Sequence, residues 1–253
     1  MTKWISHRGE SLDAPENTLA AFRLAMERGS DGVETDIHLT ADGILVCCHD
    51  ADTKHTCGES RIIEETPFAE LETLDASCGK EGFRGERIPR YAELLELLHP
   101  GKLCLTEIKE NDPRVVAAFL KEINRAGIAA EQIVMISFHK EIVRLCKVLR
   151  PEIRVQWLTG FRAQEDGTVS PSQETILDTL KDVRADGLDA AAGRESCGRS
   201  LIRAVQDAGY AVNVWTIDEE ETARFYLSAG VDFITSNRAA GLRDLFRGKD
   251  PER

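Results

Sequence analysis

The stretch Asp31-Gly32-Val33-Glu34-Thr35-Asp36-Ile37-His38-Leu39 decides how the rest of the chain is interpreted. Read as a β-strand, it presents its apolar side chains and Thr35 on one face, and Glu34, Asp36 and His38 on the other. Two carboxylates on one strand face repel each other, and burying such a pair is costly. A hard divalent cation between them removes the repulsion, because such cations bind carboxylate oxygens. From this stretch alone, a solvated strand edge is an equally good interpretation.

The composition is that of a globular, acidic protein. The 253 residues are 42% hydrophobic and 30% charged, with a formal net charge of −12. This charge argues against a nucleic-acid partner and against adsorption to an anionic membrane. No apolar run is long enough to span a membrane, and the N-terminal residues 1–4 begin no apolar signal segment, so we expect a cytoplasmic location. The seven cysteines show no C-x-x-C spacing, which favours reduced thiols over disulfides or a zinc site.

Apolar periodicity predicts eight strand–helix units in one domain. The expected strands cover 4–6, 31–39, 102–108, 132–137, 153–158, 187–189, 210–216 and 231–235, and the expected helices cover 19–26, 91–98, 113–126, 140–149, 171–183, 195–208, 219–229 and 239–246. Eight such units at this length predict a closed (β/α)₈ TIM barrel over residues 1–253. An open doubly wound sheet is the alternative, but the segment 7–11 is a poor version of the glycine-rich turn which that fold uses.

Two further features interrupt the repeating pattern. An additional strand over 44–48 follows the turn at Asp42-Gly43, and it predicts a hairpin with the strand before it. Residues 51–88 contain many charges and glycines but little periodicity. We expect them to form a small, lid-like insertion within the single catalytic domain.

Ionisable residues gather where the first strands of this predicted barrel end. Barrel enzymes carry their catalytic groups at the C-terminal ends of the strands. Glu34, Asp36 and Glu107 are oxygen ligands suited to Mg²⁺ or Ca²⁺ rather than Zn²⁺, because no cysteine or histidine pair at ligand spacing joins them. The alternative for Glu107 is an ion pair with Lys109, which lies on the same strand face.

Histidines and cations stand beside these carboxylates in the predicted barrel. His7 and His49 occupy strand ends, which suggests a general acid and a general base. Arg8 and Lys109 either contact a phosphate or neutralise the neighbouring acids. His38 shares the face of the two carboxylates and either supports the metal or merely lies beside it. Together these residues predict phosphoryl transfer or hydrolysis of a phosphodiester.

With these residues assembled, the chain resembles the glycerophosphodiester phosphodiesterase family. The motifs that carry the resemblance are His7-Arg8-Gly9, Pro15-Glu16-Asn17-Thr18, Val33 to Thr40, Asp42-Gly43, His49-Asp50, Glu107-Ile108-Lys109, Val212 to Asp218, and Gly230-Val231-Asp232. They follow the family's order along nearly the whole chain. The resemblance implies a TIM barrel that hydrolyses small glycerophosphodiesters to an alcohol and sn-glycerol 3-phosphate.

The resemblance also implies roles for single residues. Glu34, Asp36 and Glu107 match the metal ligands, His7 and His49 the catalytic acid–base pair, and Arg8 and Lys109 the phosphate contacts. Trp215 matches a wall of the substrate pocket, although a packed aromatic at the barrel rim is nearly as good an explanation. We expect Glu16 to hold Arg8, and Asn17 or Thr18 to cap the first helix.

The chain departs from the family pattern in two loops. Residues 51–59 lack the arginine that usually follows the His-Asp motif, and Thr235-Ser236-Asn237-Arg238 replaces the usual end of the last strand. Both loops border the expected site, so the sequence does not determine which alcohol group the substrate carries. Two other functions remain compatible with these residues: lyase-type cleavage that yields a cyclic phosphate, and a barrel that binds a phosphate ligand without catalysis.

Overall fold

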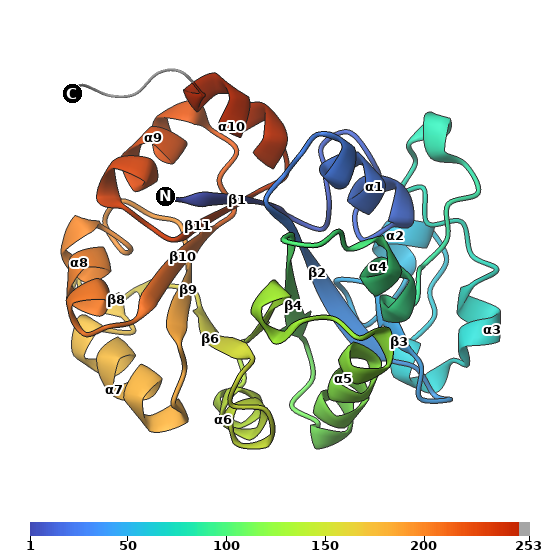
Figure 1. The fold of residues 1–253 in the computed structure, drawn as a ribbon, viewed down its shortest axis with the longest axis horizontal. Coiled ribbons are helices and arrows are strands. Elements are labelled where there is room, and N and C mark those ends of the chain that lie inside the picture. Colours follow the sequence, from blue (N-terminus) through green and yellow to red (C-terminus); the bar gives the residue numbers. More distant parts are fainter. Residues whose placement is uncertain (248–253) are drawn as a thin grey trace.

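A computed structural model describes residues 1–247 of the chain. Eight parallel strands form a closed barrel, in the order β1, β11, β10, β9, β6, β5, β4, β2, and pairing of β1 with β2 completes the ring (Figure 1). Their bounds are β1 Lys3–Ser6, β2 Gly32–Leu39, β4 Leu103–Ile108, β5 Ile133–Ser137, β6 Arg154–Thr159, β9 Gly187–Ala191, β10 Ala211–Trp215 and β11 Phe233–Ser236. The predicted (β/α)₈ barrel is therefore confirmed.

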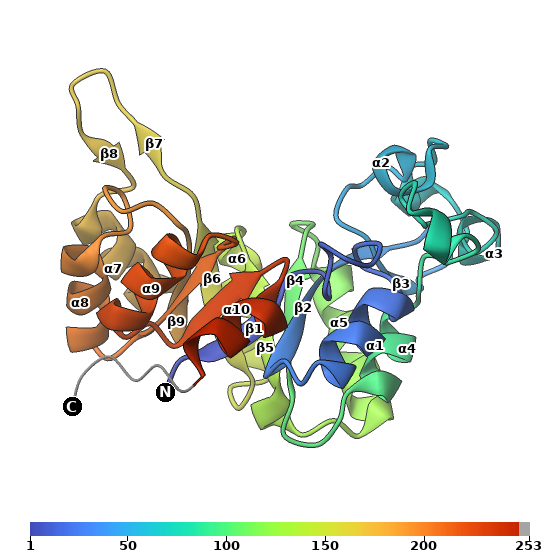
Figure 2. The same ribbon diagram turned by 90° about the horizontal axis from the view of Figure 1, so that it is seen from above.

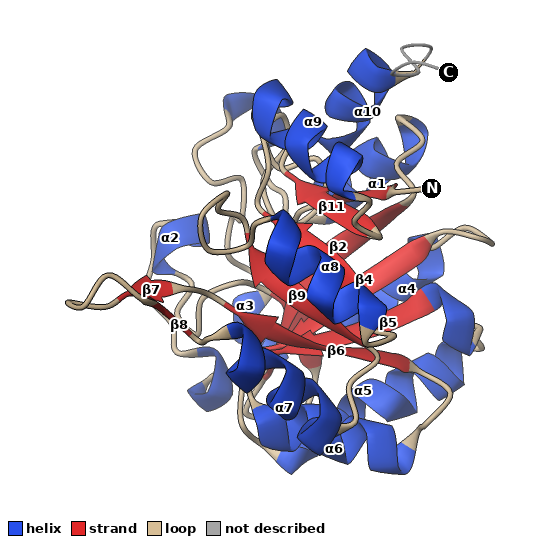
Figure 3. Ribbon diagram, turned by 90° about the vertical axis from the view of Figure 1, so that its left-hand side faces the viewer, coloured by secondary structure: helices blue, strands red, loops and turns tan. Residues whose placement is uncertain are grey.

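Helices surround this barrel, as Figure 3 shows with helices in blue around strands in red. They are α1 Leu19–Glu27, α4 Tyr91–Leu97, α5 Pro113–Ala126, α6 Lys140–Leu149, α7 Gln173–Val183, α8 Arg199–Asp207, α9 Glu220–Ala229 and α10 Ala239–Phe246. Each amphipathic helix packs its apolar face on the outside of the barrel, where it buries the outward-facing residues of the strands. Most of the hydrophobic core lies in this layer between helices and strands.

Strand β2 alternates as its sequence predicts. Val33 and Ile37 are buried in the outer core, and Glu34 and Asp36 are buried on the opposite face, toward the inside of the barrel. Gly32 begins the strand because a Cβ there would lie 2.4 Å from the backbone oxygen of Leu103 on the neighbouring strand. The two carboxylates therefore point into the barrel and not to a solvated edge.

The lower part of the barrel interior is filled with apolar side chains, which form a second cluster: Ile5, Leu103, Leu105, Val134, Ile136, Leu158 and Phe233. These residues exclude water from the barrel and support the polar residues at the C-terminal ends of the strands. A site at that end therefore has a rigid, apolar floor.

The insertion follows the hairpin strand β3 (Leu45–Cys47), which pairs antiparallel with β2. It holds the short helices α2 (Lys54–Cys57) and α3 (Phe68–Leu71), 3-10 turns at Ile63–Glu65 and Glu81–Phe83, and a small apolar core of its own. The Lys80 ammonium donates to the backbone oxygens of Ser11, Leu12 and Ala14 at 2.7, 3.0 and 2.7 Å, so the insertion is tied to the loop between β1 and α1.

Some details differ from the sequence-based prediction. The loop before α7 contains a two-stranded hairpin, β7 (Arg162–Ala163) with β8 (Val169–Ser170), which was not predicted. Figure 2 shows it and the α2–α3 segment projecting on the same side of the molecule, at opposite ends. Helix α8 begins at Arg199 rather than 195, because the preceding residues form a turn. All seven cysteines are free thiols. Within residues 1–247, no helix is both long and apolar enough to cross a membrane.

Candidate active site

Three carboxylates meet at the C-terminal end of the barrel. Glu34 and Asp36 come from β2 and Glu107 from β4, where Asp36 and Glu107 are register partners on adjacent strands. All three are buried, and one oxygen of each lies within 4.8 Å of the others. The side-chain period of two residues places all three on the inner face of the barrel, and the pairing of β2 with β4 brings Glu107 beside Asp36.

The proximity of these carboxylates to one another and to nearby cations shifts their pKa values. Burial and the neighbouring Asp36 raise the pKa of Glu34 well above its ordinary value. Burial and Asp36 also raise the pKa of Glu107 to about 7. Burial acts on Asp36 in the same direction, but the ammonium of Lys109 and the guanidinium of Arg8 outweigh it and hold the pKa of Asp36 below its ordinary value. A donor set of three buried oxygen ligands under mutual repulsion fits a hard divalent cation.

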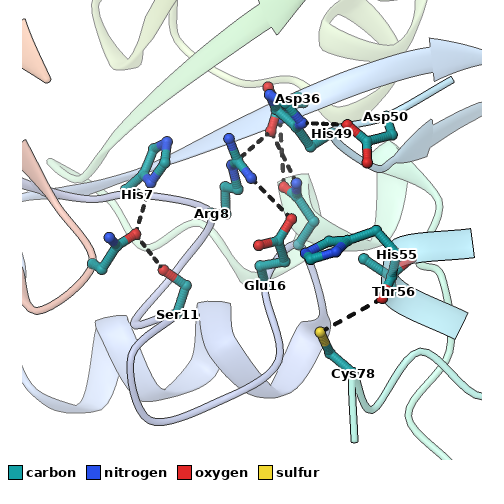
Figure 4. A network of polar contacts seen from close by, with 12 residues as sticks. His7, Arg8, Ser11, Glu16, Asp36, His49, Asp50, His55, Thr56 and Cys78 are labelled. Carbon is teal, nitrogen blue, oxygen red and sulfur yellow. Dashed lines mark hydrogen bonds and ion pairs between the residues drawn. The ribbon is translucent and has the colours of Figure 1, made fainter. Parts of the chain in front are cut away.

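Two cations border the carboxylates. Lys109 Nζ lies 2.9 Å from Glu107 Oε1 and 3.3 Å from Asp36 Oδ1, so the ion pair considered as the alternative for Glu107 is present. Arg8 Nε lies 3.3 Å from Asp36 Oδ2, and its Nη1 donates to Glu16 Oε1 at 2.9 Å (Figure 4). The expected contact between Glu16 and Arg8 is therefore observed. Both cations can face a phosphate bound at the cluster.

His7 is held by a chain of hydrogen bonds on its outer side. Its Nδ1 lies 2.7 Å from Asn237 Oδ1, which also accepts a bond from Ser11 Oγ at 2.8 Å. The Asn237 amide donates to Asp218 Oδ2 at 2.6 Å, which fixes the amide oxygen toward the imidazole. Nδ1 therefore carries the proton, and Nε2, 3.9 Å from Glu34 Oε2, has a free lone pair. Burial and the nearby Arg8 lower the pKa of His7, so the ring is neutral.

His49 reaches the site through the hairpin. β3 runs back along β2, and the backbone N–H of Cys48 donates to the oxygen of Asp36 at 3.1 Å, which brings His49 beside the carboxylates. Its Nδ1 lies 2.7 Å from Asp50 Oδ1, and the side chain is 36% exposed (Figure 4). His49 thus has a carboxylate partner and access to solvent, whereas His7 has an amide partner and is more buried.

His38 lies beyond the carboxylates, at the far end of β2. Its Nδ1 lies 2.5 Å from Glu110 Oε1, and its Nε2 donates to the backbone oxygen of His49 at 3.1 Å. Burial opposes the charged ring, but the bond to Glu110 prevails and raises the pKa of His38. The ring thereby ties the segment that carries His49 to the loop after β4.

Of the two residues expected to cap the first helix, Thr18 takes the role and Asn17 does not. Thr18 is the N-cap of α1, and its hydroxyl accepts from the backbone N–H of Ala21. The Asn17 side chain instead donates to Asp36 Oδ2 at 3.0 Å and accepts from the Thr35 hydroxyl at 2.8 Å. Thr18 takes the capping role because its extended backbone suits that position, while Asn17 adopts a positive φ of 55° that turns its amide toward β2.

A cavity of about 70 Å³ opens between these groups, and its lining includes His7, Arg8, Glu34, His49, Glu107, Lys109 and Trp215. Trp215 contributes one wall, with its ring edge-on to Phe138 at a centroid distance of 6.1 Å. A larger cavity of about 260 Å³ lies apart from this site, between the insertion and the α1–α4 side of the barrel, and its charged side chains are not buried. The chemistry therefore belongs to the smaller cavity.

Several residues of the site were not assigned from the sequence. Asn237 and Asp218 orient His7, Glu110 holds His38, and Asp189 lines the cavity from β9. Asn237 and Asp189 do stand at strand ends, which is the one signal that could have identified them.

Comparison with known proteins gives a consistent result. The model of the glycerophosphoryl diester phosphodiesterase family matches residues 7–240. A glycerophosphodiester phosphodiesterase of Caldanaerobacter subterraneus subsp. tengcongensis is 30% identical over 248 residues, which cover 96% of this chain and 97% of the relative.

Solved structures agree with this match. A phosphodiesterase from Oleispira antarctica, solved in complex with the product sn-glycerol-3-phosphate, superposes with a TM-score of 0.86 at 27% identity over 98% of both chains. A glycerophosphodiester phosphodiesterase from Agrobacterium tumefaciens superposes with a TM-score of 0.79 at 26% identity, over 96% of this chain and all of the other. The chain is therefore an enzyme of the glycerophosphoryl diester phosphodiesterase family.

Proposed function

We propose that this enzyme hydrolyses glycerophosphodiesters to an alcohol and sn-glycerol 3-phosphate, with a divalent metal ion held by Glu34, Asp36 and Glu107. One observation carries the proposal: Glu34 and Glu107 of the three-carboxylate cluster line a single cavity together with two cations and two histidines that have different hydrogen-bond partners. The product complex of the Oleispira antarctica relative supports a glycerol phosphate ligand for this pocket.

The carboxylate oxygens favour Mg²⁺ or Ca²⁺ as the metal, which, when bound, supplies Lewis-acid polarisation of the phosphoryl group. Arg8 and Lys109 provide fixed positive charge for the negative charge that develops on the phosphoryl oxygens. Because both cations are already held by carboxylates, they need no reorganisation when the substrate binds.

The two histidines differ in a way that assigns their roles. His7 is neutral with a free Nε2, so we assign it as the general base that takes a proton from the attacking water. His49 is oriented by the Asp50 carboxylate at the more exposed side of the cavity, where a departing alcohol has access to solvent, so we assign it as the general acid. The water oxygen bonds to phosphorus, the bond between phosphorus and the alcohol oxygen breaks, and the departing alkoxide receives the His49 proton.

Other residues then have supporting roles. We assign His38 to holding the backbone of His49, and Asn17 to orienting Asp36. We assign Trp215 to a wall of the substrate pocket. The insertion at 51–88 begins directly after His49 and Asp50, so we assign it to the side of the pocket where the alcohol leaves, as a small lid-like element of the catalytic domain.

Phosphorus NMR of a reaction with glycerophosphocholine tests the function directly. The enzyme, freed of metal by chelation and then supplied with Mg²⁺ or Ca²⁺, should release sn-glycerol 3-phosphate and choline. A cyclic phosphate that persists would identify lyase chemistry instead. Lack of turnover with either metal, and with glycerophosphoethanolamine as the second substrate, would contradict the proposal.

A further inference from the structure

The insertion after the hairpin strand β3 carries two half-buried cysteines that lie next to each other. Cys57 is the last residue of α2, and Cys78 lies in the loop that packs against the end of this helix. The backbone N–H of Cys78 donates to the backbone oxygen of Thr56 at 3.1 Å. By standard backbone dimensions, this bond holds the Cα atoms of Cys57 and Cys78 no more than about 7 Å apart. A disulfide joins Cα atoms that are usually about 4.4–6.8 Å apart, so the two cysteines lie within reach of one.

The two thiols also share one environment. Cys78 Sγ donates to the backbone oxygen of His55 at 3.8 Å, and Figure 4 shows this sulfur pointing toward the end of α2. Burial, Asp75 and Cys78 raise the pKa of the Cys57 thiol, and Cys78 has this effect because the two side chains are close. Both cysteines are partly open to solvent, whereas the other five are buried. Small oxidants can therefore reach this pair in the folded protein.

The backbone at Cys78 is a second, independent observation. Cys78 has a φ of 51°, in the left-handed region that favours glycine, and Gly79 follows with a φ of 74°. Among the described non-glycine residues, Arg8 and Asn17 of the active site share a positive φ. Such strained residues gather where a particular side chain is needed. Cys78 lies outside the apolar core of the insertion as the structure describes it, so packing does not account for a cysteine at this position.

A third cysteine lies near Cys57 but is a poorer partner for it. Cys48 belongs to the apolar core of the insertion, against which Cys57 packs, and is only 2% exposed. Burial, and then the charge of Cys57, raise the pKa of the Cys48 thiol to about 12, so little thiolate forms there near neutral pH. Access and chemistry therefore both favour Cys78 as the partner of Cys57.

We infer that Cys57 and Cys78 are a site of reversible oxidation, where a disulfide clamps the insertion beside the active site. With hydrogen peroxide as the oxidant, one peroxide oxygen is transferred to the Cys78 sulfur, which becomes a sulfenic acid, and water is released. The Cys57 sulfur then bonds to the Cys78 sulfur, the S–O bond breaks, and the hydroxide leaves as water with the Cys57 proton. A dithiol reductant restores both thiols by exchange.

The position of the pair determines what the disulfide holds. The insertion begins directly after His49 and Asp50, and Lys80 ties its other end to the β1–α1 loop. A bond between Cys57 and Cys78 closes residues 57–78 into a loop between these two attachments. The backbone spacing is already that of a disulfide, so the clamp fixes the insertion in the conformation that it has in the reduced protein.

Peptide mapping of the whole chain tests the bond itself. Wild type is treated with hydrogen peroxide, its remaining thiols are alkylated, and it is digested with trypsin, which cuts after Arg28, Lys54, Arg61 and Lys80. Cys57 and Cys78 then fall in the peptides 55–61 and 62–80, neither of which contains another cysteine. These two peptides should be linked, with a mass two hydrogens below their sum, and dithiothreitol should separate them. The absence of this link, a link from 55–61 to the Cys48 peptide 29–54, or a link found only in a covalent dimer would overturn the inference.

Hydrogen exchange tests whether the bond clamps the insertion. A closed loop removes conformations from the locally opened state, so amides in residues 54–80 should exchange about 10²-fold more slowly in oxidised than in reduced wild type. Cys57→Ser and Cys78→Ser should exchange equally with and without peroxide, whereas Cys48→Ala should keep the full effect. Each variant is compared with itself, so any loss of stability from the substitution cancels. Equal exchange in oxidised and reduced wild type, or protection that disappears in Cys48→Ala, would overturn the inference.

Discussion

Replacement of His49 by glutamine should slow the enzyme by an amount that depends on the leaving group. His49 is assigned as the acid because Asp50 Oδ1, 2.7 Å from its Nδ1, orients the ring at the more exposed side of the cavity. General acid catalysis contributes about 10²- to 10⁴-fold, so His49→Gln should lower kcat for glycerophosphocholine by at least about 10²-fold. That loss corresponds to about 3 kcal/mol of transition-state stabilisation.

The same variant should lose far less with an activated leaving group. The nitrophenyl ester of sn-glycerol 3-phosphate releases a phenolate that is stable without a proton, so a general acid adds little to its departure. We expect a loss of about 10-fold or less for His49→Gln with this ester, because the benefit of proton transfer falls with the basicity of the leaving group. Choline release and nitrophenolate absorbance measure the two rates under the same metal and pH.

Two control variants make the comparison specific. His7→Gln removes the proposed base, which both substrates need, so it should slow both reactions by similar factors. His55→Gln changes an exposed histidine of the insertion and should leave both rates nearly unchanged. The assignment of acid and base is refuted if His49→Gln slows both esters equally, or if the nitrophenyl ester rescues His7→Gln instead.

Further outcomes follow from the same contacts. With its pKa raised from 4.5 to about 7, Glu107 binds a proton in the folded state that it has lost in the unfolded state, so metal-free protein should lose up to about 3 kcal/mol of stability as the pH rises from 4.5 to 7. Urea unfolding with a chelator should show this decline, and Glu107→Gln should flatten it; a stability that rises with pH in this interval would contradict the sign. Asn237→Leu removes the acceptor that orients His7 and should lower kcat about 10²-fold with little change in KM. Asn237→Asp keeps an acceptor oxygen and should recover much of the rate. Equal losses of kcat in the two variants would show that Asn237 does not position His7. Lys80→Met deletes three bonds to the β1–α1 loop and should expose residues 51–88 to faster hydrogen exchange, at a local cost of about 2 kcal/mol; unchanged exchange would show that the insertion is held by its apolar core alone.

The barrel and its carboxylate cluster could be predicted from the sequence because both depend on local spacing. Strand alternation places Glu34 and Asp36 on one face, and the pairing of parallel strands brings Glu107 beside them. The same reasoning places His7 at the end of the first strand, and the predicted hairpin returns the chain along β2 so that His49 lies beside the carboxylates. These inferences need the direction and end of each strand, and not the partners of single side chains.

Contacts that depend on closure of the barrel could not be predicted in this way. Asn237 orients His7 across 230 positions of sequence, and the contact exists only because β11 pairs with β1. Asn17 shows the same limit at short range. Its type is compatible with a helix cap, and only the packing of the β1–α1 loop against β2 shows that it binds Asp36 instead. The β7–β8 hairpin is exposed, so its strands lack the apolar alternation that identifies the barrel strands.

The structure divides the active end of the barrel into two halves that carry different unfavourable features. On the side of β2 and β4, three carboxylates repel one another. On the side of β9 to β11, one polar atom in each of Asp189, Asn213, Trp215 and Thr235 is buried without a hydrogen-bond partner. Each feature lowers the stability of the unliganded fold, and the apolar floor and the outer core must compensate for both. If a cation relieves the first and a polar ligand in the cavity relieves the second, the two ligands should stabilise the protein additively where their contacts do not overlap, because each satisfies a different half of the barrel.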